Sequence, residues 1–323
     1  MCRSYTAGMN ARIQRWQLLL RAILALATLV GCWRSDAPGL GLLLAAAVFW
    51  LYGLGMLMIF AWLPRLNTGQ PPPGRMQLLR AWWHELITCE RVFAWQQPFA
   101  AQRYADFLPS NSGGNSGNSG SGQRGVLLLH GFTCNRGVWN RWMERLRAHG
   151  HPHIALTLEP AYGSIDAYVA QIEAAVQTLE QRCGQPPVIV GHSMGGLAAR
   201  AWWRRHGQVG RIHRFLTLGT PHAGTLMARF GATVNARQMC RQSRWLSELA
   251  AHEAAASSAQ QSQDFAARFD CYFSRCDQIV CPADTAVLPG SQAIEVVGSG
   301  HLALVFQPTI LADLLRLLEK KPA

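Results

Sequence analysis

From Gly125 to the C-terminus, short apolar runs typical of β-strands alternate with longer runs typical of helices. The strand-like runs are VLLLHG, HIALTL, PPVIVG, RIHRFLTLGTPH, RFDCYFSR and QAIEVVG, and TILADLLRLLEK closes the chain as a helix. Strands joined through helices pair in parallel, because each crossover returns the chain to the same end of the sheet. The alternation therefore predicts an α/β fold, with a mostly parallel central sheet flanked by helices and a functional site at the carboxyl ends of the strands.

One strand-to-helix junction carries a candidate nucleophile. In VIVGHSMGGLAARAWW, residues 188–203, Ser193 lies between two glycines where the strand-like run becomes helix-like. A serine in such a tight turn presents its hydroxyl clear of the backbone, and the glycines keep Cβ atoms from blocking it. The short pattern also occurs by chance, but the strand before it and the helix after it favour a nucleophile elbow.

A serine nucleophile needs a base and an acid that orients the base, and in the arrangement with an elbow they follow in the order Ser, Asp, His. Asp277 comes directly after CYFSRC and leaves its strand at the carboxyl end, whereas Asp270 begins that strand at the opposite end. Asp284 is the alternative acid. His301 follows AIEVVGSG, another strand that ends in a glycine loop, and is the predicted base.

The oxyanion that forms during acyl transfer needs two preorganised N–H donors. Met194, the residue after the nucleophile, would supply one of them from the start of the helix. The other would come from Phe132 in HGFTCNRG, the loop after the VLLL strand.

The motifs HGF, GHSMGG, GTPHAGT and GSGH, together with Asp277, resemble the lipase and esterase branch of the α/β-hydrolases over residues 91–323. The resemblance implies an α/β-hydrolase fold and cleavage of carboxylic esters through an acyl-enzyme, with no cofactor and no metal. It also implies a helical cap insertion over residues 226–268. Acyl transfer or thioester hydrolysis would use the same triad, and a non-catalytic membrane scaffold is a third, less favoured alternative.

The N-terminal 66 residues differ in kind from the rest. Residues 39–63 contain no charge, and 25 residues of helix suffice to cross a hydrocarbon core of about 30 Å. Residues 16–33 form a second candidate span, although Arg21 interrupts it. We expect residues 1–66 to be a membrane anchor, most simply a helical hairpin. A cleaved signal sequence, or a lipid on Cys32 within LVGC, remains an alternative for the first span.

Arginine placement predicts the orientation of this hairpin. Both flanks are basic, whereas the short connection between the two spans carries Arg34 beside Asp36. Positive residues stay in the cytoplasm, so both ends of the hairpin and the catalytic domain are expected there, at a bacterial inner membrane. The flanking arginines are Arg3, Arg12, Arg15, Arg65, Arg75, Arg80 and Arg91. The expected partners are the bilayer and a lipid or acyl-ester substrate.

Residues 67–90 form a juxtamembrane segment, in which a proline-rich stretch precedes RMQLLRAWWHELI. That run predicts a helix that either lies along the membrane surface or packs on the catalytic domain. ERVFAWQQPFAAQRYADFLP is expected to form two short strands. The Asn-, Ser- and Gly-rich residues 111–125 are expected to be a flexible loop within the catalytic domain.

Composition excludes several other functions. The net charge of +12 comes from 28 arginines and only two lysines, but no arginine-rich block interleaved with aromatics marks a nucleic-acid surface. The nine cysteines are scattered and odd in number, which fits neither a disulfide framework nor a metal site. The oligomeric state is left open.

Overall fold

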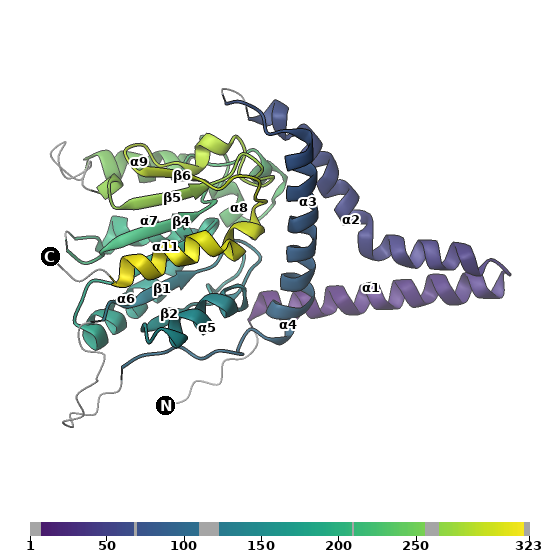
Figure 1. Cartoon of the computed structure of the whole chain (residues 1–323), viewed down its shortest axis with the longest axis horizontal. Helices are drawn as coiled ribbons and strands as arrows, with labels where there is room; N and C mark the ends of the chain where they lie inside the picture. The colour runs from purple at the N-terminus through teal and green to yellow at the C-terminus, as the bar shows by residue number, and fades with distance from the viewer. Residues whose placement is uncertain (1–7, 68–69, 110–122, 209, 256–264, 320–323) are drawn as a thin grey trace.

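The computed structural model describes residues 8–67, 70–109, 123–208, 210–255 and 265–319 of the 323-residue chain. Within these residues a parallel sheet is covered by helices on both faces, and two long N-terminal helices project away from it (Figure 1). The strands are β1 (Val126–Leu129), β2 (His153–Ala155), β3 (Val188–His192), β4 (Arg214–Leu218), β5 (Phe269–Phe273) and β6 (Gln292–Glu295). The α-helices are α1 (Met9–Arg34), α2 (Pro38–Leu66), α3 (Arg75–Cys89), α4 (Gln97–Phe99), α5 (Asn140–Ala148), α6 (Val169–Cys183), α7 (Met194–His206), α8 (Val234–Gln238), α9 (Arg244–Ala255) and α11 (Pro308–Glu319).

Shorter helical turns complete the structure. They are the π-helix η1 (Glu90–Gln96) and the 3₁₀ helices η2 (Arg136–Trp139), η3 (Ile165–Tyr168), η4 (Met227–Phe230), η5 (Ala283–Ala286) and η6 (Leu302–Phe306). Each predicted strand from VLLLHG to QAIEVVG overlaps one of the observed strands, so the α/β prediction is confirmed. The cysteines that the structure describes carry free thiols.

The strand order β2-β1-β3-β4-β5-β6 reverses direction between β1 and β3. Helices that follow these two strands leave opposite faces of the sheet, so a crevice opens outside their carboxyl ends, and ligands of parallel α/β sheets bind there. The loop after β1 contains Phe132, and the turn after β3 contains Ser193. Topology alone therefore places the predicted nucleophile and the predicted oxyanion loop side by side.

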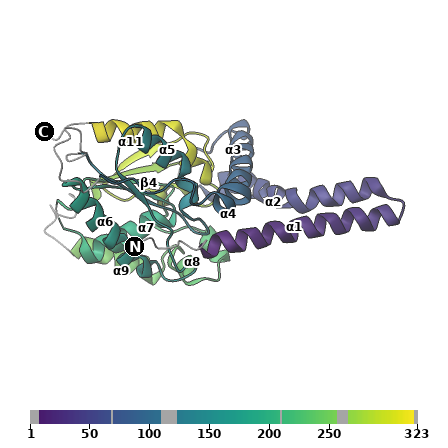
Figure 2. The same ribbon diagram turned by 90° about the horizontal axis from the view of Figure 1, so that it is seen from below.

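The central strands β1 and β3 are buried at every position, which fits their apolar residues at successive positions. Leu127 and Leu129 of β1 pack into one core with α6 and α7. Val126 and Leu128 pack into a second core with α5 and α11. Figure 2 shows these two helix layers on opposite sides of the strands.

Residues 90–109 contradict the prediction of two short strands. The π-helix η1 continues directly from α3 and leads into α4. Only an isolated antiparallel bridge, Phe107 with His153, has strand character. The aromatic and β-branched composition suggested strands, but tertiary packing decided the outcome, because Val92, Gln96 and Gln97 are buried against neighbouring helices. The loop predicted over residues 111–125 lies mostly outside the described residues.

The N-terminal helices form an antiparallel hairpin, α1 and α2, that stands out from the sheet (Figure 1, Figure 2). Both are long and apolar enough to cross a membrane, and only 6% of the most apolar 18-residue stretch of each is buried. A core helix of a soluble domain would instead bury most of that stretch. The helix α3 lies across the foot of the hairpin, between it and the sheet (Figure 1).

Helix α3 combines the two alternatives that its sequence left open. One side packs on the domain that contains the sheet and on α2, since Leu78, Ala81 and Leu86 are buried. The side bearing Trp83 and Ile87 stays about half exposed, at 48% and 49%. The helix is thus a packed element of the domain that also carries an uncovered apolar face.

Candidate active site

Ser193 occupies the sharp turn between β3 and α7. Its backbone has φ 54° and ψ −124°, a conformation that costs energy for a residue with a Cβ and that recurs at functional turns. Neighbouring glycines permit the turn, because a Cβ on Gly191 would lie 2.6 Å from the Gly196 nitrogen and one on Gly195 would collide with the Leu129 oxygen. The local sequence therefore builds the predicted elbow.

His301 and Asp277 meet at the same edge of the sheet. Asp277 follows β5, and His301 immediately precedes η6. The Nδ1 atom of His301 donates a hydrogen bond of 2.8 Å to Oδ2 of Asp277, and both side chains are buried. The other oxygen of Asp277 accepts from the backbone nitrogens of Ile279 and Val280 at 2.8 and 2.7 Å. The carboxylate is thus fixed, and its contact sets which imidazole nitrogen carries the proton.

The chain after β4 makes room for this pair. Gly219 has φ 53°, and a Cβ there would lie 2.9 Å from Oδ2 of Asp277 and 3.1 Å from Nδ1 of His301. Further along GTPHAGT, the Thr225 hydroxyl donates to the Ile279 oxygen and accepts from the Cys281 nitrogen. The motif is therefore a scaffold that supports the loop carrying Asp277.

His192 connects the elbow to the histidine loop. Its Nε2 atom donates to the His301 carbonyl oxygen at 3.2 Å, and the two rings are 4.7 Å apart. Burial lowers the pKa of His192 well below its usual range, so this ring is neutral.

Opposing effects act on the pKa of His301. Burial lowers it, while the Asp277 carboxylate, its hydrogen bond and the negative charge of Glu85 raise it, and the net result is a raised pKa. The protonated form of His301 is therefore favoured by two carboxylates.

The sequence predicts Met194 and Phe132 as the two oxyanion donors. Met194 is the first residue of α7, where a backbone N–H has no partner within the helix. Phe132 lies in the loop after β1, and no described residue accepts a hydrogen bond from its nitrogen. Gly131 brings this loop against the elbow, since a Cβ on it would lie 2.9 Å from the Ser193 Cβ.

Helix α1 holds the same loop from outside. Asn10 donates from Nδ2 to the Cys134 oxygen at 2.7 Å, and Gln14 donates from Nε2 to the Thr133 oxygen at 3.1 Å. Thr133 has φ 60°, so these contacts stabilise a strained backbone next to Phe132. Nothing in the sequence of the apolar N-terminal helix indicates this role.

The alternative acids lie elsewhere. Asp284 is exposed on η5. Asp270, at the start of β5, pairs with Arg214, whose Nη2 lies 2.6 Å from the Asp270 carboxylate. Of the three carboxylates considered, Asp277 alone contacts His301.

Glu85 is a further residue of the site that sequence reasoning missed. It belongs to α3, is 1% exposed, and accepts hydrogen bonds from the backbone nitrogens of Leu302 and Ala303. Gln278 donates to it at 2.8 Å and accepts from the His301 nitrogen at 3.1 Å. The one available signal was that Glu85 is the sole acidic residue in α3.

Two other expectations concern the surroundings of the site. Residues 226–268, the expected cap, contain η4, α8 and α9, but residues 256–264 lie outside the described part of the chain. Among the described residues, no group of three His, Cys, Asp or Glu side chains is placed to hold a metal ion.

A family model described as the alpha/beta hydrolase family matches residues 126–314, more than half of the chain. The chain therefore belongs to the alpha/beta hydrolase family. The prediction of a hydrolase of the esterase and lipase kind is confirmed at the level of the family, and the matched residues include Ser193, Asp277 and His301. The helices α1 to α3 lie outside the match.

The chain is similar to curated esterases over a limited length. A pimeloyl-(acyl-carrier protein) methyl ester esterase of Vibrio vulnificus is 36% identical over 75 residues, which are 23% of this chain and 29% of that protein. The protein of the same name from Vibrio cholerae is 34% identical over 82 residues, 25% of this chain and 31% of its own length. The chain thus covers less than a third of these two relatives.

Solved lipases share the fold. The mature form of a Bacillus licheniformis lipase superposes with a TM-score of 0.53 at 14% identity, covering 66% of this chain and 98% of that one. Lipase B of Aspergillus fumigatus gives 0.52 at 14% identity, covering 98% and 83%. At these identities the likeness establishes the architecture alone.

Proposed function

We propose that this protein is a membrane-anchored serine hydrolase that cleaves carboxylic esters through an acyl-enzyme on Ser193. The observation that carries the proposal is the buried pair of His301 and Asp277, 2.8 Å apart, at the sheet edge where the elbow presents Ser193. This is the constellation that activates a serine hydroxyl.

In this mechanism the Oγ atom of Ser193 attacks the ester carbonyl carbon while His301 accepts its proton at Nε2. Asp277 holds the Nδ1 proton and stabilises the imidazolium. The backbone nitrogens of Phe132 and Met194 bind the oxyanion. His301 then protonates the leaving alkoxide, and water, activated by the same histidine, releases the acid and regenerates Ser193.

The proposed substrate is an amphiphilic ester with an acyl chain. The curated relatives are named for a methyl ester on an acyl-carrier protein, and the solved neighbours are named lipases, so an acyl chain is common to both. A substrate of this kind dissolves in the bilayer, where the exposed apolar hairpin would also reside.

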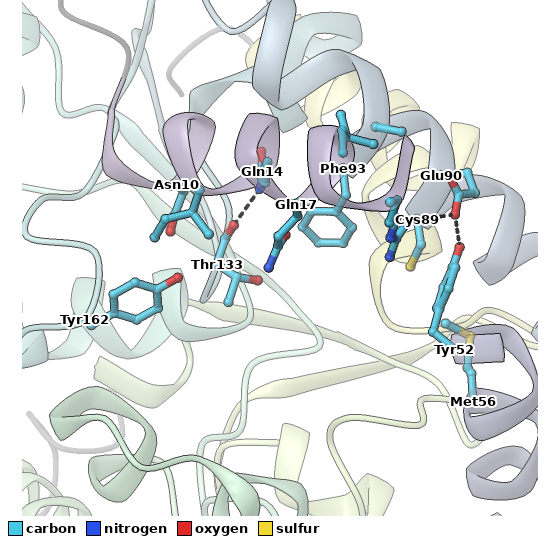
Figure 3. A pocket seen from close by; sticks show the side chains of 14 residues that line it. Asn10, Gln14, Gln17, Tyr52, Met56, Cys89, Glu90, Phe93, Thr133 and Tyr162 are labelled. Carbon is cyan, nitrogen blue, oxygen red and sulfur yellow. Dashed lines mark hydrogen bonds and ion pairs between the residues drawn. The ribbon is translucent and has the colours of Figure 1, made fainter. Parts of the chain in front are cut away.

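A groove of about 360 Å³ supports this choice, and Figure 3 shows it from close by. Its volume falls within the range of roughly 300–1,000 Å³ that is usual for ligand sites. Thr133 and Tyr162 lie at one end, next to the oxyanion loop, and Tyr52 and Met56 of α2 lie at the other (Figure 3). The groove thus leads from the foot of the hairpin to the loop that carries Phe132.

The lining of the groove suits a chain with a polar head. Ile13, Leu18 and Phe93 are apolar. Asn10 and Gln14 are buried near the oxyanion loop, and each has a side-chain oxygen with no partner among the described residues. These oxygens can accept hydrogen bonds from the polar end of an ester lipid while its chain lies along α1.

The central test is labelling of the full chain in detergent with a fluorophosphonate probe. Wild-type protein should be labelled and should hydrolyse p-nitrophenyl butyrate, while Ser193→Ala should lose both activities and keep its melting temperature. The melting temperature should stay unchanged because the Ser193 hydroxyl, at the turn, contributes little to packing. Labelling or substantial turnover by Ser193→Ala would contradict the mechanism.

The groove gives a second prediction, on chain length. Ile13→Trp fills the groove, so turnover of p-nitrophenyl palmitate should fall at least about tenfold while butyrate turnover stays within about twofold. Leu20→Trp is the matched control, because Leu20 lies on the same helix, is 57% exposed and is outside the groove lining. Equal losses on both esters, or no loss on palmitate, would exclude the groove as the acyl site.

A further inference from the structure

Helix α3 lies outside the part of the chain that matches the hydrolase family, yet it inserts a buried carboxylate behind the histidine loop. Both oxygens of Glu85 are used there. Oε1 accepts from the Leu302 nitrogen and from Nε2 of Gln278, and Oε2 accepts from the Ala303 nitrogen, each at 2.8 Å. Hydrogen bonds from these donors favour the charged form of the carboxylate and oppose the effect of its burial.

We propose that Glu85 is a positioning residue for the catalytic histidine: it fixes the backbone that carries His301 and adds a negative charge facing the imidazolium. This inference rests on the proposed function of Ser193, Asp277 and His301.

The first argument is the capping of η6. Leu302 and Ala303 are the first two residues of η6, whose N–H groups have no partner within the helix. The carboxylate of Glu85 satisfies both, from an element more than 200 residues away in sequence. Since His301 directly precedes these two residues, the cap determines where the imidazole lies.

Gln278 provides a second connection. Its side chain donates to Glu85 and accepts from the His301 nitrogen, and in sequence it follows Asp277. Glu85 therefore contacts both loops whose side chains form the candidate histidine and aspartate pair. Displacing the Glu85 carboxylate would therefore disturb both His301 and Asp277, the partners of the 2.8 Å hydrogen bond.

Close packing leaves Glu85 little freedom. A Cβ on Gly300 would lie 2.5 Å from Oε2 and 2.8 Å from Cβ of Glu85, so glycine is required where the histidine loop passes α3. A contact this close transmits the position of α3 to the loop.

The second role proposed for Glu85 is electrostatic, and it depends on the charged groups around His301 and Asp277. Asp277 and Glu85 are the anionic groups that raise the pKa of His301. His192 is neutral, and burial also raises the pKa of the Cys89 thiol beside Glu85, so that thiol is neutral too. The pKa of Glu85 itself is raised, because the effect of burial exceeds that of its hydrogen bonds and of His301, which lower it.

The experiment compares Glu85→Gln and Glu85→Asp with wild type, using full-length protein in detergent. Gln keeps the size of the side chain but removes its charge and turns an N–H donor toward a backbone donor. Asp keeps the charge but is one methylene too short to reach both nitrogens. Glu173→Gln is the matched control, because Glu173 is a mostly buried, hydrogen-bonded carboxylate of α6, remote from His301.

We expect Glu85→Gln to lower kcat for p-nitrophenyl butyrate by about tenfold or more with KM within about twofold, because chemistry rather than binding is affected. The acid limb of its pH profile should move to lower pH, since loss of a facing negative charge lowers the pKa of His301. Glu85→Asp should lower kcat while leaving the acid limb near that of wild type. Glu173→Gln should change neither.

A folded Glu85→Gln protein with wild-type kcat and an unmoved acid limb would overturn the inference. If that variant melts below the assay temperature, Glu85→Asp decides, and wild-type kcat in it would overturn the positioning role. Fluorophosphonate labelling of wild-type protein separates the two proposals. An unlabelled wild type refutes the proposed function, whereas equal labelling rates in wild type and Glu85→Gln refute only the role of Glu85.

Discussion

His301 draws its properties from three separate elements. Asp277 reaches it from the loop after β5, Glu85 from α3, and His192 from the end of β3. No one of these neighbours is within 20 residues of it in sequence. The protonation behaviour of the proposed base is therefore a product of the fold, and it is measurable as a pH profile.

The histidine must be neutral to act as a base, and its pKa in the folded protein is raised above its ordinary value by the Asp277 carboxylate. Activity should thus fall as the pH drops through this raised pKa. Asp277→Asn removes the carboxylate that raises this pKa, so the acid limb should move to lower pH while the maximal rate falls by on the order of a thousandfold or more. The pH dependence of kcat/KM on p-nitrophenyl butyrate measures both effects.

Asp284→Asn is the matched control for that measurement, because Asp284 is exposed on η5 and makes no contact with His301. Its profile should coincide with that of wild type. A larger loss of rate from Asp284→Asn than from Asp277→Asn would reverse the assignment of the acid.

The sequence predicted best those helices and strands whose own residues form a strong local pattern. The runs that became β1 and β3 are short, apolar and bounded by turns, and the glycines around Ser193 are needed by the turn itself. The prediction for residues 90–109 was wrong because their composition favours strands, whereas contacts with α1, α3 and η2 decide their structure. Glu85 was not foreseeable because a single acid in an amphipathic helix normally faces water, and its partners are distant in sequence.

The segment after α4 nevertheless contacts the part of the chain that matches the hydrolase family. Asp106 pairs with the buried Arg136 at 2.6 Å and accepts from the Ala155 nitrogen of β2 at 3.1 Å. Asp106→Ala should therefore lower the stability by about 1–2 kcal/mol, a range reduced because Asp106 is partly exposed. Thermal unfolding followed by tryptophan fluorescence measures the change.

Glu248→Ala serves as the control for Asp106→Ala, since among the described residues Glu248 pairs with the exposed Arg244 on the same helix and with no other cation. Its melting temperature should stay close to that of wild type. On the same reasoning, a fragment that starts at Gly125 lacks the partner of Arg136 and should not fold. A stable, active fragment of that kind would refute the assignment of residues 91–323 to one domain.

At the scale of the whole molecule, the hairpin and the candidate site share one edge. Helix α1 binds the oxyanion loop through Asn10 and Gln14, and α3 binds the histidine loop through Glu85. Helix α3, which carries exposed apolar side chains, lies at the foot of the hairpin (Figure 1). If the hairpin spans a bilayer, the catalytic edge faces the membrane surface, which is where an amphiphilic ester would be presented.

The side of the membrane that this edge faces follows from the arginines. Arg12, Arg15 and Arg65 lie close to the ends of the hairpin that join the catalytic domain. At the far end, Arg34 is the last residue of α1 and is offset by Asp36 in the turn that follows. Positive residues resist translocation, so the turn should cross and the catalytic domain should stay in the cytoplasm.

A green fluorescent protein fused to the C-terminus should then be fluorescent, and an alkaline phosphatase fused there inactive. Phosphatase inserted at Ser35 is the reciprocal control and should be active. The opposite pattern, an active C-terminal phosphatase with a dark fluorescent fusion, would place the catalytic domain outside and favour an exported enzyme whose first helix acts as a signal.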